Sequence, residues 1–179
     1  MLSAINISNV FDFQIIVTIT MLLATWKWGD WKNWRLYHST MLFFIVISFL
    51  YSLLTYNYPL WQFESPLLKV TFSNILITCV FFPASLLIYL YHFPNGLKKQ
   101  ILYIFLWVGN NSIIEMVSYK LGFISYHHGW TIWLSVLFNC AMYPLFYVHH
   151  KKPLWAIYVS LISVVLGMIY WKIPISSMK

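Results

Sequence analysis

Long apolar runs separated by short polar segments are the dominant pattern in this chain of 179 residues. A helix needs about 20 mostly apolar residues to cross the hydrocarbon core of a bilayer. Six runs approach that length, near residues 10–26, 39–56, 69–91, 98–119, 129–148 and 154–171. They are apolar on most sides, unlike the alternating strands of about 10 residues in a membrane β-barrel. The pattern predicts an all-α fold, a single polytopic integral membrane helical bundle over residues 1–179 with six transmembrane helices and short loops.

The first run has the weakest apolar character, because Asp12 and Gln14 lie close to its start. A shorter helix in the membrane interface would leave five crossings. No basic residue precedes the run and no small-x-small cleavage site follows it, so a cleavable signal peptide is not expected. Pro83 and Pro144 lie inside predicted spans and can kink them. We therefore expect five or six crossings, with the first helix retained.

Composition narrows the class of protein. Apolar residues make up 61% of the chain and charged residues 8%, whereas about 25% of the residues in a soluble domain are charged. So few charges cannot cover the surface of a water-soluble monomer, and so apolar a chain does not match a disordered composition. Aromatic residues reach 21%, and most tryptophans fall at the ends of predicted spans, as in the aromatic belts of membrane proteins. An integral membrane protein is the class that remains.

Basic residues are divided unequally between the two sides of the predicted bundle. Three alternate loops hold Lys27, Lys32, Arg35, Lys98, Lys99, Lys151 and Lys152, and the opposite side holds Lys69, Lys120, Lys172 and Lys179. The positive-inside rule makes the side with seven charges cytoplasmic, which places both termini outside if there are six spans. The net charge of +7 does not indicate nucleic-acid binding, because these residues are loop-end pairs and not one clustered face.

Lipid and protein are the expected partners. Anionic lipid head groups are expected at Lys98, Lys99, His149, His150, Lys151 and Lys152. Ser163 and Gly167 form a small-x3-small pattern, which permits close helix packing within the chain, in a homo-oligomer or with another membrane protein. Cys79 and Cys140 lie about midway along their spans with no metal-binding or redox spacing, so no metal site and no cofactor are expected.

Glu115 is the one acidic residue well inside a predicted span. A carboxylate at that depth is costly, so it is expected to face the bundle interior or a wet cavity and marks a candidate functional site. Asn111 and Tyr119 are each four residues from it and share its face of the helix. With a rise of 1.5 Å per residue, Glu115, Asn74 and Ser135 each lie roughly 7–9 Å below the outer boundary.

A second polar layer lies near the membrane midplane, where Asn111 and Asn139 coincide in depth. Together the two layers predict a polar chamber in the outer half of the bundle, with Glu115 as its charge. The alternative interpretation is that these side chains only join helices, by hydrogen bonds that contribute about 0.6–2 kcal/mol each.

Two loops on the outer side add candidates above Glu115. One carries Trp61 and Glu64, and the other carries the adjacent residues His127 and His128. Neighbouring histidines seldom chelate one ion, and no H-x3-H spacing supports a metal site. The ligand-binding candidates are Glu115, Asn111, Asn74, Asn139, Ser135, Tyr119, His127, His128, Glu64 and Trp61.

Three segments resemble a known family. They are Trp34-x-x-Tyr37-His-Ser-Thr40, Trp61-x-x-Glu64, and Glu115 followed by Gly122-x-x-x-Tyr126-His-x-Gly129-Trp130 and Ser135. Over most of its length the chain is similar to a group of small multipass membrane proteins of spore-forming Firmicutes (bacilli and clostridia) that have no established activity. The resemblance implies a bacterial plasma-membrane protein, and it carries over no catalytic residue.

Three functions are compatible with these features. The first is binding or transport of a small polar or cationic solute through an outward-facing chamber centred on Glu115. The second is a structural or assembly subunit in which Glu115 pairs with another protein. The third is a membrane enzyme acting on a lipid or isoprenoid, with Glu115 as general acid within about 3–5 Å of His127 or His128. The chain contains no P-loop, GxSxG or HExxH motif, so an enzyme is the least favoured of the three.

Overall fold

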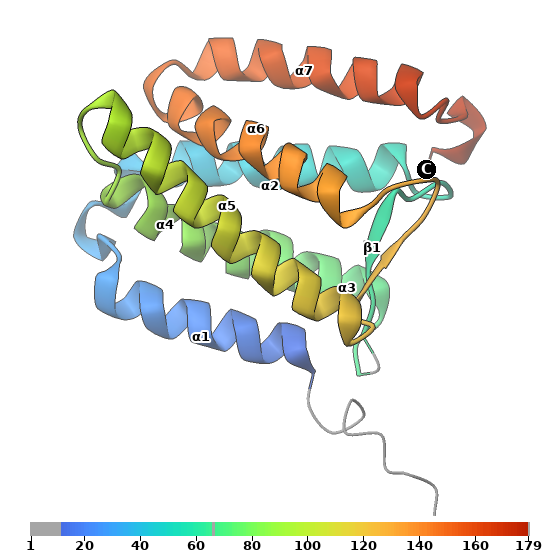
Figure 1. The fold of residues 1–179 in the computed structure, drawn as a ribbon, viewed down its shortest axis with the longest axis horizontal. Helices are drawn as coiled ribbons and strands as arrows, with labels where there is room; N and C mark the ends of the chain where they lie inside the picture. The colour runs from blue at the N-terminus through green and yellow to red at the C-terminus, as the bar shows by residue number, and fades with distance from the viewer. Residues whose placement is uncertain (1–11, 66, 179) are drawn as a thin grey trace, which may run out of the picture.

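Each of the six apolar runs forms helix in the computed structural model, which describes residues 12–65 and 67–178 (Figure 1). The α-helices are α1 (Phe13–Trp28), α2 (His38–Leu54), α3 (Val70–Leu76), α4 (Phe82–Tyr91), α5 (Leu97–Lys120), α6 (Ile132–Lys151) and α7 (Pro153–Tyr170). The shorter elements are the 3-10 helices η2 (Trp31–Leu36) and η4 (Ile175–Ser177), the π-helical segment η3 (Ile77–Phe81), and the strands β1 (Trp61–Phe63) and β2 (Ile124–Tyr126).

Four helical segments are long and apolar enough to cross a membrane. They are Val70–Tyr91, which joins α3, η3 and α4, together with Leu97–Lys120, Ile132–Lys151 and Pro153–Tyr170. The remaining apolar helices, α1 and α2, have 16 and 17 residues and fall below that length. The mostly helical fold, with four segments long and apolar enough to cross a membrane, is therefore confirmed, whereas six complete crossings stay a prediction. Residues 10 and 11, at the predicted start of the first run, lie outside the described residues.

The polar residues at the start of α1 form its cap and its anchor. Asp12 precedes the helix, and its Oδ1 accepts a hydrogen bond of 2.9 Å from the Gln14 backbone N–H, as an N-cap residue does. The other Asp12 carboxylate oxygen accepts from the Ser65 hydroxyl. Gln14 is only 3% exposed, and its amide donates to the Glu64 and Phe123 carbonyls at 2.9 Å each. Asp12 and Gln14 thus attach α1 to the two loops that we predict to lie on the outer side.

Those loops pair as an antiparallel sheet, which the prediction of simple short loops missed. Trp61 of β1 lies opposite Tyr126 of β2. Backbone hydrogen bonds of 2.8 Å, from Glu64 N–H to Phe123 and from His127 N–H to Leu60, extend the ladder at both ends. We call this end of the bundle the sheet end and the opposite end the basic end (Figure 1). The helix order brings to the basic end Lys27, Lys32, Arg35, Lys98, Lys99, Lys151 and Lys152.

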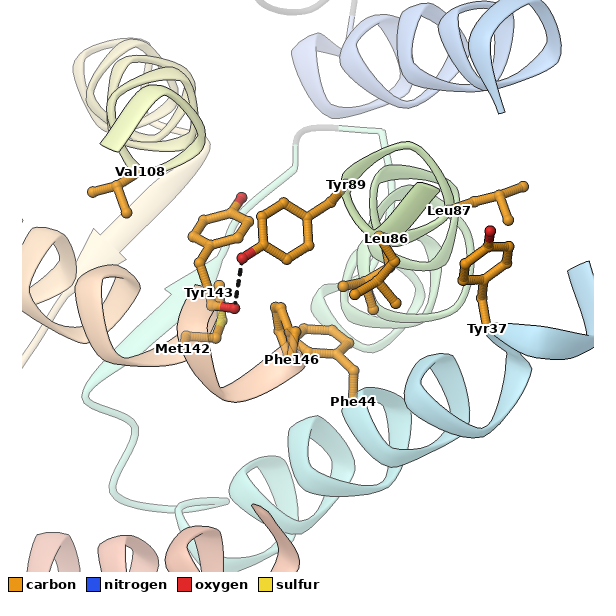
Figure 2. Close-up of a cluster of buried hydrophobic side chains, with 10 residues drawn as sticks. Tyr37, Phe44, Leu86, Leu87, Tyr89, Val108, Met142, Tyr143 and Phe146 are labelled. Atoms are coloured by element: carbon orange, nitrogen blue, oxygen red, sulfur yellow. Dashed lines mark hydrogen bonds between the residues drawn. The ribbon is translucent and has the colours of Figure 1, made fainter. Parts of the chain in front are cut away.

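Aromatic side chains from four helices fill the core. Tyr89 of α4 is completely buried at its centre, and its hydroxyl donates a 2.9 Å hydrogen bond to the Tyr143 carbonyl of α6 (Figure 2). Phe44 of α2 and Val108 of α5 reach the same cluster. α1 and α7 lie at opposite edges of the bundle (Figure 1), so their outward faces are apolar and exposed, as expected for contact with lipid.

Pro83 is accommodated by a local change of helix type. Proline has no backbone N–H, so it cannot donate to the carbonyl four residues earlier, at Cys79. Cys79 lies within the π-helical segment Ile77–Phe81, immediately before α4. The regular hydrogen-bond pattern of the span Val70–Tyr91 is therefore interrupted where the proline requires it.

The expectation that His149 contacts lipid head groups is wrong. Its side chain is 4% exposed, stacks on Phe43 with ring centroids 4.1 Å apart, and lies 3.0 Å from the Thr40 hydroxyl through Nδ1. His150 stacks on Tyr37. The reason is helical geometry: residue 149 follows the buried residues Tyr143 and Phe146 at intervals of three on the inward face of α6. The neighbouring residues Lys98, Lys99, Lys151 and Lys152 are exposed at the basic end, and their contact with lipid stays a prediction.

Candidate functional site

Glu115 lies near the sheet end of α5, five residues before the last residue, Lys120. Its Oε1 accepts a 2.8 Å hydrogen bond from the Tyr126 hydroxyl. Tyr126 reaches the helix because side chains alternate along a strand, and β2 presents Ile124 and Tyr126 on the same face. The pairing of β2 with β1 thereby fixes the position of the donor above the carboxylate.

α6 supplies two further polar side chains to the carboxylate of Glu115. Ser135 and Asn139, one turn apart and both buried, are hydrogen-bonding neighbours of the carboxylate. The Ser135 oxygen accepts a 2.8 Å hydrogen bond from the Trp130 indole N–H, which leaves the hydroxyl proton free to point at Glu115. The groups that surround the charge are therefore a phenol, a hydroxyl and an amide, all of them neutral donors.

The surroundings of Tyr126 favour its protonated phenol, the form that can donate a hydrogen bond. Burial, and next the negative charge of Glu115, raises the pKa of the Tyr126 phenol above its ordinary value, because both disfavour a phenolate. The ring stacks on Tyr119 with centroids 4.8 Å apart. Tyr119 is exposed, so one aromatic face of this cluster is open to the surroundings of the protein.

The opposite face of the sheet carries a separate polar network. Glu64 Oε1 accepts from Ser125 Oγ at 2.9 Å and from Gln62 Nε2 at 3.0 Å. His127 Nε2 lies 3.0 Å from the same Ser125 oxygen. Because the single hydroxyl proton of Ser125 is donated to Glu64, the contact requires that His127 Nε2 carries a proton and donates it. Glu64 and His127 therefore belong to one network, but on the face of β2 that does not meet Glu115.

Aromatic stacking fixes the two remaining loop candidates. His128 stacks on Tyr58 with ring centroids 3.4 Å apart. Trp61 stacks on Tyr51 of α2 at 4.0 Å and lies 4.6 Å from Trp130. The Tyr51 hydroxyl also accepts hydrogen bonds from the backbone N–H groups of Leu60 and Trp61, at the start of β1, so this aromatic group attaches the sheet to the bundle.

The structure brings together four of the ten predicted site residues. Ser135 and Asn139 contact Glu115, and Tyr119 joins them through Tyr126. Asn74 on α3 and Asn111 on α5 are half-buried, and within residues 12–65 and 67–178 neither is hydrogen-bonded to Glu115. Tyr126, the direct partner, was not among the site candidates. The alternation of apolar and polar residues over Ile124-Ser125-Tyr126-His127 is the signal that indicates a strand with Tyr126 facing inward.

A double-mutant cycle tests the bond between Glu115 and Tyr126. We expect Tyr126→Phe and Glu115→Leu to be coupled by about 0.6–2 kcal/mol, the range of side-chain hydrogen bonds in membrane proteins. The free energy of unfolding of the purified protein and its three variants provides the measurement. Ser125→Ala, on the other face of the same strand, is the control and should show no coupling to Glu115→Leu. Additive effects of the first pair would contradict the bond.

Within the described part of the chain, no group of three or more His, Cys, Asp or Glu side chains is arranged to hold a metal ion. Comparisons with protein-family models, with curated proteins and with solved structures found no match to this chain.

Proposed function

We propose that this membrane protein binds a small cationic or polar solute, an amine or a metal cation of low charge, at Glu115 beneath the sheet. The observation that carries the proposal is the Glu115 carboxylate, which lies inside a helix long and apolar enough to cross a membrane. The side chains that contact this carboxylate, Tyr126, Ser135 and Asn139, are all neutral. A carboxylate at such a depth is rare outside substrate, ion and proton pathways. A bound cation would balance its charge.

The aromatic groups favour an organic cation. Tyr119 and Tyr126 stack beside the carboxylate, and the face of a tyrosine ring attracts ammonium groups within about 6 Å. Glu115 would supply the charge, the ring of the exposed Tyr119 a stacking surface, and Asn139 an amide for polar parts of the solute. Transport of the solute through the bundle would require the sheet to move away from α5.

The same proposal includes the location of the protein. We propose a bacterial plasma membrane, with the basic end cytoplasmic and both termini outside if all six apolar helices cross. Seven Lys and Arg side chains at one end, against a smaller number at the sheet end, support that orientation. Glu115 would then lie in the outer half of the membrane.

The contacts of the histidines give the alternative enzyme hypothesis no support. That hypothesis requires His127 or His128 beside Glu115, but His127 bonds to Ser125 and His128 stacks on Tyr58. A structural or assembly subunit is the second candidate, because the neutral surroundings of Glu115 would equally suit a basic side chain of another protein.

Thermal unfolding of the purified protein with a series of cations tests the proposed function. The probes are the chlorides of sodium, potassium, methylammonium, tetramethylammonium and choline at constant ionic strength. At a concentration of 100 times the dissociation constant, a ligand stabilises the folded state by about 2.7 kcal/mol. We expect a saturable rise in the unfolding temperature with at least one probe, and its loss in Glu115→Gln.

Glu64→Gln is the matched control, since it removes a carboxylate from the other face of the sheet and should retain the full shift. Retention of the shift by Glu115→Gln would overturn the proposal. So would a wild-type protein whose unfolding temperature responds to none of the five cations.

A further inference from the structure

One face of α5 is exposed along most of its length. It is formed by Leu102, Leu106, Gly109, Asn110, Ile113 and Met116, and the exposed fractions of Leu106 and Ile113 are 63% and 59%. The spacing of three and four residues places these side chains in one stripe. We call this stripe the α5 stripe. Its side chains are exposed and so are not covered by α6, the helix that α5 contacts most.

Asn110 is the polar residue of the α5 stripe. It lies 13 residues after Leu97 and 10 before Lys120, about 2 Å from the middle of the helix at 1.5 Å per residue. Its side chain is exposed and takes part in no hydrogen bond with any residue of 12–65 or 67–178. Lipid tails offer an amide neither donor nor acceptor, so an amide at this depth is costly until another protein group pairs with it.

From this geometry we infer that the α5 stripe binds the α5 stripe of a second copy of the chain, with the two Asn110 amides hydrogen-bonded to each other. An asparagine side chain has one carbonyl and one NH2 group, so it is complementary to itself. A two-fold axis along the membrane normal places every residue at the same depth as its copy, and Asn110 therefore meets Asn110 of the second copy.

Gly109 permits the close approach that this pairing needs. It is exposed in the stripe beside Asn110, and no atom lies within 4 Å of the position that a Cβ would occupy. Small residues let the backbones of membrane helices approach closely, and polar residues then join them by hydrogen bonds. A lone asparagine in an apolar helix interface also fixes the register of the two helices.

The small-x3-small pattern on α7 is a less favourable site for contact between two copies of the chain. The Ser163 hydroxyl donates to the Val159 carbonyl of its own helix at 2.9 Å, so it does not require a partner. Ser163 lies about 2 Å from the middle of α7, at the same relative depth as Asn110 on α5. This residue is therefore a depth-matched control and the site of the competing interface.

Disulfide cross-linking in lipid bilayers locates the contact. In a background of Cys79→Ala and Cys140→Ala, we expect Leu106→Cys and Ile113→Cys to form covalent dimers on oxidation, since both flank Asn110 in the stripe. Ser163→Cys should stay monomeric. The α5 proposal fails if Ser163→Cys cross-links and the α5 variants do not, or if none of the three cross-links.

The dimer dissociation constant, measured in bilayers by fluorescence energy transfer between labelled copies, tests the role of the amide. Loss of two hydrogen bonds should raise the constant about tenfold in Asn110→Leu, which corresponds to about 1.4 kcal/mol. Asn110→Gln, which keeps an amide, should weaken the dimer less. Asn110→Leu places an apolar residue on an apolar surface, so its unfolding temperature as a monomer should match that of the wild type. An unchanged dissociation constant in Asn110→Leu would show that the amides do not pair.

Discussion

Replacing Tyr89 with alanine is expected to lower the free energy of unfolding by about 3–5 kcal/mol, the cost typical of removing a large buried aromatic side chain. Tyr89 is 0% exposed, and its ring contacts Phe93, Tyr103, Trp107 and Tyr143. Truncation would leave a cavity between α4, α5 and α6, where packing density is the principal source of cohesion between membrane helices. Reversible unfolding of the purified protein in mixed micelles measures the loss.

Two further variants separate packing from hydrogen bonding at the same place. Tyr89→Phe removes only the hydroxyl that donates to the Tyr143 carbonyl at 2.9 Å, so it should cost about 0.6–2 kcal/mol. Tyr91→Ala, two residues along the same helix and 51% exposed, should cost less than 1 kcal/mol. A loss at Tyr89→Ala no larger than that at Tyr91→Ala would mean that the aromatic cluster does not hold the bundle together.

The positions of the helices follow from the sequence because the thickness of the hydrocarbon sets the length of each apolar run. Predicted and observed ends differ by at most three residues, as at residue 10 against Phe13 and at residue 148 against Lys151. The two short helices show the limit of this argument. The sequence predicts a span at 39–56 and leaves 10–26 open between a span and a shorter interfacial helix, and the helices there, α2 and α1, have 17 and 16 residues.

Contacts between helices were predicted less well, since depth is only one of the two coordinates that place a side chain. Asn74 has the predicted depth of Glu115 but lies on α3 and is not hydrogen-bonded to it, whereas Ser135 and Asn139 lie on α6, which packs directly on α5. Residues that share a depth meet only if their helices are neighbours and turned toward each other. Hydrophobic periodicity does not specify which helices become neighbours.

The sheet was missed for a different physical reason. Each strand has three residues, too short for alternation to stand out beside runs of about 20 apolar residues. Its partners Trp61 and Tyr126 are far apart in the sequence, so the pairing is visible only after the helices have brought the two loops together. The direct donor to Glu115 lies on this sheet, and the site could not be completed without it.

Gln14→Glu is expected to cost about 3–5 kcal/mol, because it places a carboxylate against two carbonyl oxygens in a buried position. The Gln14 amide donates to Glu64 and Phe123 at 2.9 Å each, whereas its own oxygen is buried without a hydrogen-bond partner. A glutamate has the same shape and no N–H group, so both carbonyls would lose the Gln14 donor, and the Phe123 carbonyl would keep only the Glu64 N–H. Since Phe123 immediately precedes β2, the substitution should also release the sheet and the Tyr126 hydroxyl from Glu115.

Two measurements distinguish this effect from a general loss of stability. Amide hydrogen exchange at Glu64 and His127, whose N–H groups bond across the ladder at 2.8 Å, should accelerate more than exchange in the core of α6. Gln100→Glu makes the same chemical change at the basic end, where Gln100 donates to the Pro94 carbonyl at 3.2 Å, and should cost less than 1 kcal/mol. Equal costs at the two positions, or unchanged exchange at Glu64 and His127, would refute the view that Gln14 holds the sheet over the site. The attachment of the sheet to the bundle would then rest on Tyr51 and Trp61.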